Sequence, residues 1–300
     1  MDIICKNLRF EYNKNTEFSV PALDGVSLEI KEGEFFGIIG HTGSGKSTFV
    51  QHLNALIPLQ QGELEIGEYD LSLQLSKKRK NRAELKSKLR NLRRDVGMVF
   101  QYPEYQLFAE TVKDDVAFGI KNFMPDLSPR EIEIYAKNAI ETVGLNYDEV
   151  KDKSPFELSG GQKRRVAIAG VIAVKPKILI LDEPCAGLDP VGKKELWLLL
   201  DRLHSTSVKT IIIVSHDMND VADHCTKAVI FDHGKVKKVG TPKELFDDFK
   251  LIEDCGLEVP VTAYLKKNLS AHGINIDTDY SSEDFSDKLS AYLKKITCNE

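Results

Sequence analysis

Apolar residues in this chain gather into short runs, and each run ends in glycine or polar residues. Apolar strands are predicted at 35–39, 96–100, 177–182 and 211–214. The run at 177–182 is typical of a strand buried on both faces of a parallel sheet. Alternating apolar and polar positions between residues 3 and 30, and again at 62–66, instead predict antiparallel strands. The pattern therefore predicts an α/β fold that combines a sheet core with an antiparallel β subdomain.

Helical spacing and helix start signals fill much of the remaining chain. Residues 49–56 alternate like an amphipathic helix directly after a strand and a glycine-rich loop. Ser128, Pro129 and Glu131 form a capping box with proline at the first helical position. We expect a domain over residues 1–240, a helical subdomain inserted at about 102–165, and a C-terminal helical extension over 241–300 that is suited to contact a partner.

The glycine-rich loop has the spacing G-x-x-x-x-G-K-S between a strand and a helix. Its residues are Gly40, His41, Thr42, Gly43, Ser44, Gly45, Lys46, Ser47 and Thr48. Glycines permit turn geometry in which backbone N–H groups wrap a polyphosphate, and the following helix directs its positive dipole end at the anion. We expect Lys46 to reach the β and γ phosphates and Ser47 to offer its hydroxyl to Mg²⁺.

Polar residues stand at the carboxyl ends of three further apolar strands. Asp182 is placed to hold Mg²⁺, and Glu183, one residue further, to accept a proton from the attacking water. Gln101 offers an amide that can ligate Mg²⁺ and orient water, and His216 is placed to touch a γ-phosphate at the edge where α/β sheets bind ligands. These residues predict a site for ATP hydrolysis.

The sequence contains a second glycine motif. One phosphate-binding loop is enough for one phosphate group, so the second motif needs another explanation. It comprises Ser159, Gly160, Gly161 and Gln162 at a predicted helix start. We interpret it as a sign that two chains share one nucleotide. Tyr12 lies where an aromatic face can stack on adenine, although Phe10 or Phe18 would serve as well and a plain core aromatic is the simpler reading of Tyr12 alone.

The composition indicates the cellular environment of the chain, and one basic segment departs from its acidic average charge. The chain has 300 residues, a formal net charge of −5 and five scattered cysteines without a C-x-x-C pair, which predicts reduced thiols. The amino terminus shows no signal-peptide pattern, and we expect no membrane span. Between Lys77 and Arg94, however, ten basic residues face one glutamate. A solvated helix face or loop is the simpler interpretation of this basic segment, and a membrane-surface contact is the alternative.

Taken together and in this order, the motifs resemble the nucleotide-binding domains of ABC ATPases over about residues 1–240. The resemblance implies a P-loop NTPase (RecA-like) fold and two domains that sandwich two ATP molecules, each held by the phosphate loop of one chain and the signature, here 158–162, of the other. It places Tyr12 against adenine and adds Asp189, in the Leu188-Asp189 motif, to the nucleotide-binding residues.

Within that family, three stretches look like the ATPases of energy-coupling factor transporters, and like the second of their two paralogous types. They are the sequence of the phosphate loop, residues 101–108 and the motif Ala-Gly-Leu-Asp-Pro. The resemblance implies uptake of vitamins or transition-metal ions, a peripheral place on the cytoplasmic side of the cell membrane, and three partners: a paralogous ATPase, a membrane coupling subunit and a substrate-binding membrane subunit.

Two other functions stay open from the sequence. One is a soluble ABC ATPase that acts on nucleic acid or a ribosome through the basic segment, and the other is the ATPase of an importer with a soluble binding protein. Two positions depart from the family pattern. Cys185 stands where a small residue or threonine is expected, and the basic segment is longer than usual.

Overall fold

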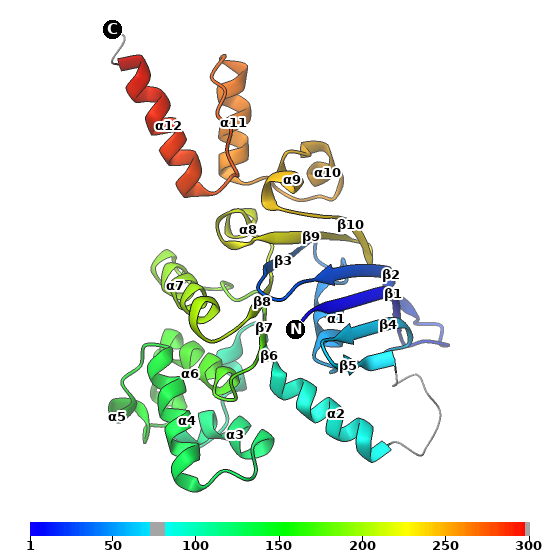
Figure 1. The fold of residues 1–300 in the computed structure, drawn as a ribbon, viewed down its shortest axis with the longest axis vertical. Helices are drawn as coiled ribbons and strands as arrows, with labels where there is room; N and C mark the ends of the chain where they lie inside the picture. The colour runs from blue at the N-terminus through cyan, green and yellow to red at the C-terminus, as the bar shows by residue number, and fades with distance from the viewer. Residues whose placement is uncertain (73–81, 298–300) are drawn as a thin grey trace.

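A computed structural model describes residues 1–72 and 82–297, which form two β-sheets surrounded by helices (Figure 1). The larger sheet has the order β10 (Lys235–Gly240), β9 (Lys227–Asp232), β3 (Phe35–Ile39), β8 (Thr210–Val214), β7 (Ile178–Asp182) and β6 (Val96–Val99). Its strands from β9 to β6 are parallel, and β10 pairs antiparallel with β9. The predicted α/β class with a parallel sheet is confirmed.

The carboxyl ends of the parallel strands meet at one edge of this sheet, because neighbouring parallel strands run in the same direction. In the register, Ile39 lies opposite Ile230, and Asp182 lies opposite Val214. The segments that follow β3, β6, β7, β8 and β9 are therefore neighbours in space. This edge collects the predicted site residues that follow the strands.

The smaller sheet is antiparallel and has the order β2 (Val20–Ile30), β1 (Ile3–Tyr12), β4 (Gln61–Ile66) and β5 (Tyr69–Asp70). It packs with α1 (Lys46–Leu53) against one face of the larger sheet. Phe36, Phe49 and Phe231 are fully buried in the core between them. The predicted antiparallel β subdomain is thus present and encloses the helix that follows the glycine loop.

Helices cover the opposite face of the larger sheet and share a second core with it. They are α3 (Val112–Phe123), α4 (Pro129–Thr142), α5 (Tyr147–Val150), α6 (Gly160–Ile172), α7 (Pro190–Thr206) and α8 (Met218–His224). The 3₁₀ turns η3 (Pro103–Gln106) and η4 (Pro155–Glu157) lie in the same part of the chain. The capping box at Ser128 and Glu131 begins α4 as predicted. In Figure 1, α3, α4, α5 and α6 form one green group beside the sheet.

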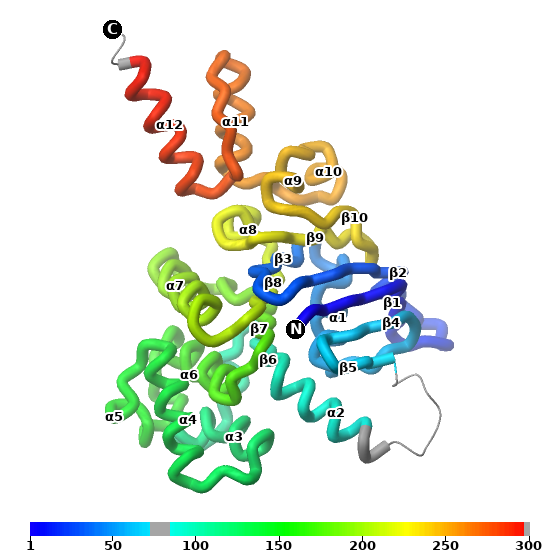
Figure 2. Tube along the Cα trace, viewed as in Figure 1, coloured from blue at the N-terminus to red at the C-terminus, as the bar shows by residue number. Residues whose placement is uncertain are grey.

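The C-terminal part is helical, and its last two helices extend away from the sheets (Figure 2). It comprises α9 (Pro242–Phe246), α10 (Phe249–Asp254), α11 (Val261–Ala271) and α12 (Ser282–Thr297). Tyr280 anchors it, because its ring is 1% exposed, its hydroxyl donates to Asp247, and its carbonyl accepts from the Thr262 hydroxyl at 2.6 Å. Among the described residues, no helix combines the length and apolarity that a membrane span needs.

The structure bears on the predicted end of the loop helix, on the basic segment and on the cysteines. Helix α1 ends at Leu53 rather than Leu56, because the chain turns back at Ala55, whose φ is +52°. Within the basic segment, residues 82–95 form helix α2 (Arg82–Asp95), whereas 77–81 lie outside the described residues. The cysteines Cys5, Cys185, Cys225 and Cys255 are free thiols, and Cys298 lies outside the described part of the chain.

Candidate functional site

The glycine loop connects β3 to α1 and approaches its surroundings closely. A Cβ atom at Gly40 would lie 2.3 Å from the Phe231 carbonyl oxygen, and one at Gly45, whose φ is +102°, would lie 2.5 Å from the Ala22 carbonyl oxygen. Side chains at these two positions would force the loop away from the sheets. Around Gly43, by contrast, the space is open. The glycines therefore hold a tight loop whose outer turn is free to meet a ligand.

Lys46 lies inside this loop, and no carboxylate of the described residues forms an ion pair with it. Its ammonium group donates to the carbonyl oxygens of Gly40 at 2.8 Å and His41 at 2.9 Å, and its side chain is buried. Burial lowers the pKa of Lys46, against the raising influence of Glu183 and Asp182. A buried ammonium that is held by neutral carbonyls is suited to receive a polyanion. The loop therefore fits the phosphate groups of ATP.

Ser47 and Asp182 come together from α1 and the end of β7. Burial raises the pKa of the Asp182 carboxyl group, and a hydrogen bond from Ser47 opposes that rise. A hydroxyl and a carboxylate oxygen in contact are the oxygen ligands that Mg²⁺ prefers. This donor pair fits a magnesium ion beside the phosphate loop.

Glu183 follows Asp182 and is in contact with both Gln101 and His216. Its Oε2 accepts a hydrogen bond of 2.9 Å from Gln101 Nε2, and its Oε1 lies 3.5 Å from His216 Nδ1. The backbone of Glu183 has a φ of +49°, which turns the chain sharply where β7 ends, and its N–H donates to Val214 O at 3.0 Å. The four strand-end residues that the sequence singles out, including Asp182, thus meet at one edge of the sheet.

Tyr12 stands at the end of β1 and is hydrogen-bonded to the loop helix. Its hydroxyl lies 3.1 Å from Thr48 Oγ1, and its ring packs edge-on against buried Phe10. Phe18, the other aromatic alternative, is 77% exposed. Tyr12 is 40% exposed, so that it keeps an open ring surface close to the phosphate loop.

The second glycine motif begins α6, and within the part of the chain that the structure describes it makes no hydrogen bond or ion pair with the phosphate loop. Ser159 accepts a hydrogen bond from the backbone N–H of Gln162, whose side chain accepts from the Ser159 N–H in return. Cβ atoms at Gly160 and Gly161 would meet nothing within 4 Å, so the start of α6 is open. Asp189 caps α7 by accepting from Gly192 N at 2.7 Å. Neither Ser159 nor Asp189 is bonded to residues 40–48 among the described contacts.

Two residues that the sequence did not single out hold the site in place. Arg164 of α6 donates to Glu104 and to the carbonyl oxygens of Pro184 and Ala186. No local sequence pattern pairs an arginine with a glutamate 60 residues away, so only the fold reveals this contact.

The second residue is Lys193 of α7. Its ammonium group lies 2.6 Å from Asp217 and 2.8 Å from Asp220, which flank the start of α8 just after His216. The buried carboxylate of Asp220 also accepts from Trp197 Nε1 at 3.2 Å. Together these contacts fix the segment that carries His216. The position of Lys193 four residues before Trp197 on one helix face was the available signal.

Comparison with known proteins decides the family. The family description "ABC transporter" matches residues 23–186. The chain belongs to the ABC transporter family. It is 47% identical over 280 residues to the energy-coupling factor transporter ATP-binding protein EcfA2 of Clostridioides difficile (strain 630), with 93% of each chain covered. It is 43% identical to the protein of the same name from Caldanaerobacter subterraneus subsp. tengcongensis, with 98% of each chain covered. The expected energy-coupling factor subfamily is confirmed.

Solved structures agree on the fold. The chain is similar to cbiO1 of Clostridium perfringens, described as part of the ABC transporter complex cbiONQ, with a TM-score of 0.70, 35% identity and coverage of 88% of this chain and 98% of that one. It is also similar to the ATP-binding cassette MJ0796, solved as a dimer bound to ADP and Pi, with a TM-score of 0.67, 30% identity and coverage of 79% and 97%. This ABC ATPase therefore has the expected P-loop NTPase fold and is an ATP-hydrolysing transport enzyme.

Proposed function

We propose that this ABC ATPase hydrolyses MgATP at the edge formed by residues 40–48, Gln101, Asp182, Glu183 and His216. The observation that carries the proposal is the contact of Glu183 with both Gln101 and His216, directly beside the Lys46 loop. In this proposal Glu183 accepts the proton of the attacking water, and His216 contacts the γ-phosphate. Tyr12 stacks on adenine.

Magnesium is part of the proposed reaction. Ser47 and Asp182 would hold the ion, with Gln101 as a further ligand, and the ion would neutralise charge on the β and γ phosphates. The influence of Ser47 on the pKa of Asp182, which it lowers by hydrogen bonding, supports this assignment, because a hydroxyl and a carboxylate so placed can both turn an oxygen toward one ion. Lys46 would contact the same phosphates from inside the loop.

We further propose that the working unit is a heterodimer with a paralogous ATPase. Residues 159–162 and Asp189 would then serve the nucleotide held by the partner's phosphate loop. The absence of described contacts between α6 and the chain's own phosphate loop supports this arrangement, as does the open start of α6. MJ0796, a related cassette, was solved as a dimer bound to ADP and Pi.

The proposed setting is the cytoplasmic side of the cell membrane, where the dimer would dock on a membrane coupling subunit and serve a separate substrate-binding membrane subunit. The imported substrates would be vitamins or transition-metal ions. We assign residues 1–240 to the nucleotide-binding domain and 241–300 to a helical extension that contributes to dimer contacts. Exposed apolar side chains on α11, Val261 and Tyr264, support that contact.

Coexpression with a candidate paralogue and the membrane subunits tests the proposal. We expect the four proteins to copurify in detergent and the complex to hydrolyse ATP in a manner that depends on Glu183. Copurification with ribosomes or RNA would instead favour the nucleic-acid function, and dependence on a soluble binding protein would favour the other importer class.

In the proposed complex, the exposed basic residues Lys86 and Arg90 of α2 are candidates for a minor contact with the membrane surface.

A further inference from the structure

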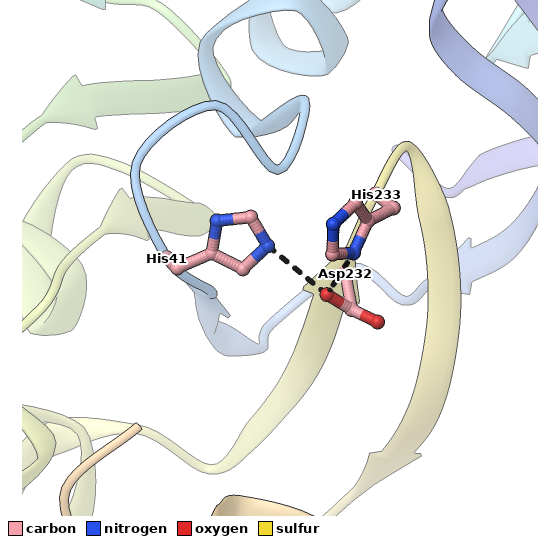
Figure 3. A group of neighbouring side chains, drawn as sticks. All are labelled: His41, Asp232 and His233. Atoms are coloured by element: carbon pink, nitrogen blue, oxygen red, sulfur yellow. Dashed lines mark hydrogen bonds and ion pairs between the residues drawn. The ribbon is translucent and has the colours of Figure 1, made fainter. Parts of the chain in front are cut away.

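A group of nitrogen and oxygen ligands joins the phosphate loop to the end of β9, and the proposed hydrolysis assigns no catalytic step to its side chains (Figure 3). Its members are His41 of the loop, and Asp232 and His233 at the end of β9. One ligand atom from each lies within 4.8 Å of the others. The sheet register explains the meeting, since Ile39 lies opposite Ile230 and each chain continues two residues to His41 and Asp232.

The hydrogen bonds of His41 determine which of its ring nitrogens is free. Nδ1 lies 2.8 Å from the carbonyl oxygen of Thr42, and a carbonyl oxygen only accepts, so Nδ1 carries the hydrogen. In the neutral ring Nε2 then has a lone pair, and it lies 3.0 Å from Asp232 Oδ1. Two electron-rich atoms at this separation need a cation between or beside them.

The remaining members complete a ligand set on the same oxygen. His233 Nδ1 lies 2.6 Å from Asp232 Oδ1, so both imidazoles converge on one carboxylate atom. The other carboxylate oxygen, Oδ2, is 2.9 Å from Lys237 Nζ. The hydrogen bond from this lysine lowers the pKa of Asp232 below its ordinary value.

The geometry points to a binding site for a first-row transition-metal dication at His41 Nε2, Asp232 Oδ1 and His233 Nδ1. Imidazole and carboxylate ligands suit Zn²⁺, Co²⁺ and Ni²⁺, whose bonds to them are about 2.0–2.2 Å long. Atoms that share a tetrahedral ion at that distance lie roughly 3.3 Å apart. His41 Nε2 is 3.0 Å and His233 Nδ1 is 2.6 Å from Oδ1, so ion binding requires outward shifts of about 0.3 and about 0.7 Å. The contacts from Nδ1 of His41 to a carbonyl and from Lys237 to Oδ2 are the outer partners that such ligands commonly have.

The surroundings of the three ligands determine how an ion reaches the site and what its binding would do to the phosphate loop. His233 is exposed, and a hollow of about 390 Å³ lined by Asp232, His233 and Lys237 opens beside it, so an ion and its waters can reach the site from solvent. A bound ion would tie the phosphate loop to the turn between β9 and β10, which already donates from Gly234 N to Ser44 O at 2.9 Å. The fold of the loop would therefore be stabilised by the ion.

Zinc titration of the full chain, freed of nucleotide and chelators, tests the site by calorimetry. We expect one Zn²⁺ per chain, and at least about tenfold weaker binding in His233→Asn and His41→Gln, since the loss of even an outer partner costs about 10–100-fold. Asparagine suits position 233, whose φ is +47°, because it tolerates the left-handed conformation better than alanine. His272→Asn, at the residue that caps the C-terminal end of α11, is the matched control and should bind as wild type does.

Two further readouts make the result independent of ATP hydrolysis. Zn²⁺ should raise the melting temperature of wild type but not of His233→Asn, and Co²⁺ should give a visible absorption band that the same variant loses. Wild-type zinc affinity in both His233→Asn and His41→Gln would overturn the proposal. A loss of zinc binding that occurs in His216→Gln and in neither of these variants would overturn it as well. Absence of stoichiometric binding by wild type would assign the position between His41 and Asp232 to a proton and equally overturn it.

Discussion

Arg164 and Glu104 form a bidentate ion pair that joins the helix after the second glycine motif to the segment after Gln101. Nε of the arginine donates to Oε2 at 3.1 Å, and Nη2 donates to Oε1 at 3.0 Å. The same guanidinium donates to Pro184 O at 3.1 Å and Ala186 O at 2.9 Å, just beyond Glu183. One buried side chain thus connects three segments of the proposed catalytic edge, so that they shift together.

Replacement of Glu104 by glutamine should therefore destabilise the protein. It leaves the charge of Arg164 buried without a counterion, which costs about 3 kcal/mol in comparable pairs. Urea unfolding measures this loss. The neighbouring Arg165 supplies a matched control, because its partner Glu195 is exposed, and Glu195→Gln should cost less than about 1 kcal/mol. Equal losses in the two variants would contradict the structural role given to Arg164.

Replacement of Glu183 by glutamine should stop ATP turnover and leave ATP bound. The change keeps the shape of the side chain but removes the group that accepts a proton, which is typically responsible for a factor of 10²–10⁴ in rate. Steady-state hydrolysis by the assembled complex and ATP retention by filter binding measure the two effects. Turnover within about twofold of wild type would show that another group is the base. Glu195→Gln is again a suitable control, because that residue is exposed.

The residues at the ends of the parallel strands are the part of the site that the sequence predicts. Asp182, Glu183 and His216 each follow an apolar run, and parallel strands bring such ends together whatever their order in the sheet. The pair Arg164–Glu104 and the meeting of His41 with Asp232 depend on which strands and helices become neighbours. That order is set by packing of the whole core, to which single motifs contribute little. The end of α1 at Leu53, three residues before the predicted end, has a different and local reason, the turn at Ala55 with its positive φ.

Replacement of Lys46 by alanine should weaken nucleotide binding itself. The ammonium group is held inside the loop by two carbonyl oxygens, so it is placed to neutralise phosphate charge before the reaction begins. Calorimetric titration with ATP, in the presence of Glu183→Gln to prevent hydrolysis, measures the affinity. Lys209→Ala, at an exposed position, should leave it unchanged. Equal affinities for the Lys46 variant and its parent would remove Lys46 from the site.

Replacement of Lys193 by methionine should destabilise the protein more at alkaline than at acidic pH. Burial already raises the pKa of Asp220, and loss of the lysine raises it further. The native state then binds a proton that the unfolded state has lost, so the free energy of unfolding falls as pH rises through that range. Denaturant unfolding at about pH 5 and about pH 8 measures the difference, which we expect to be about 1 kcal/mol or more. Lys194→Met, at the exposed neighbouring position, should show no such dependence.

Replacement of Ser159 by alanine should impair the nucleotide site whose phosphate loop belongs to the partner chain. Ser128 provides the matched control, because it closes the same kind of capping box at α4. Both alanine variants lose a helix cap and should cost about 1 kcal/mol of stability, but only the Ser159 variant should slow hydrolysis in the heterodimer.

Pairing with Lys46→Ala identifies the affected nucleotide. ATP binding at this chain's own Lys46 should be nearly unchanged in the Ser159 variant, since the two elements serve different nucleotides. Mass measurement of the complex, with and without the paralogue, shows which subunits are present. A fully active monomer would contradict the shared sites. An active homodimer coupled to a transporter would keep the shared-site mechanism and contradict the heterodimer, because each site would then take its second motif from an identical chain.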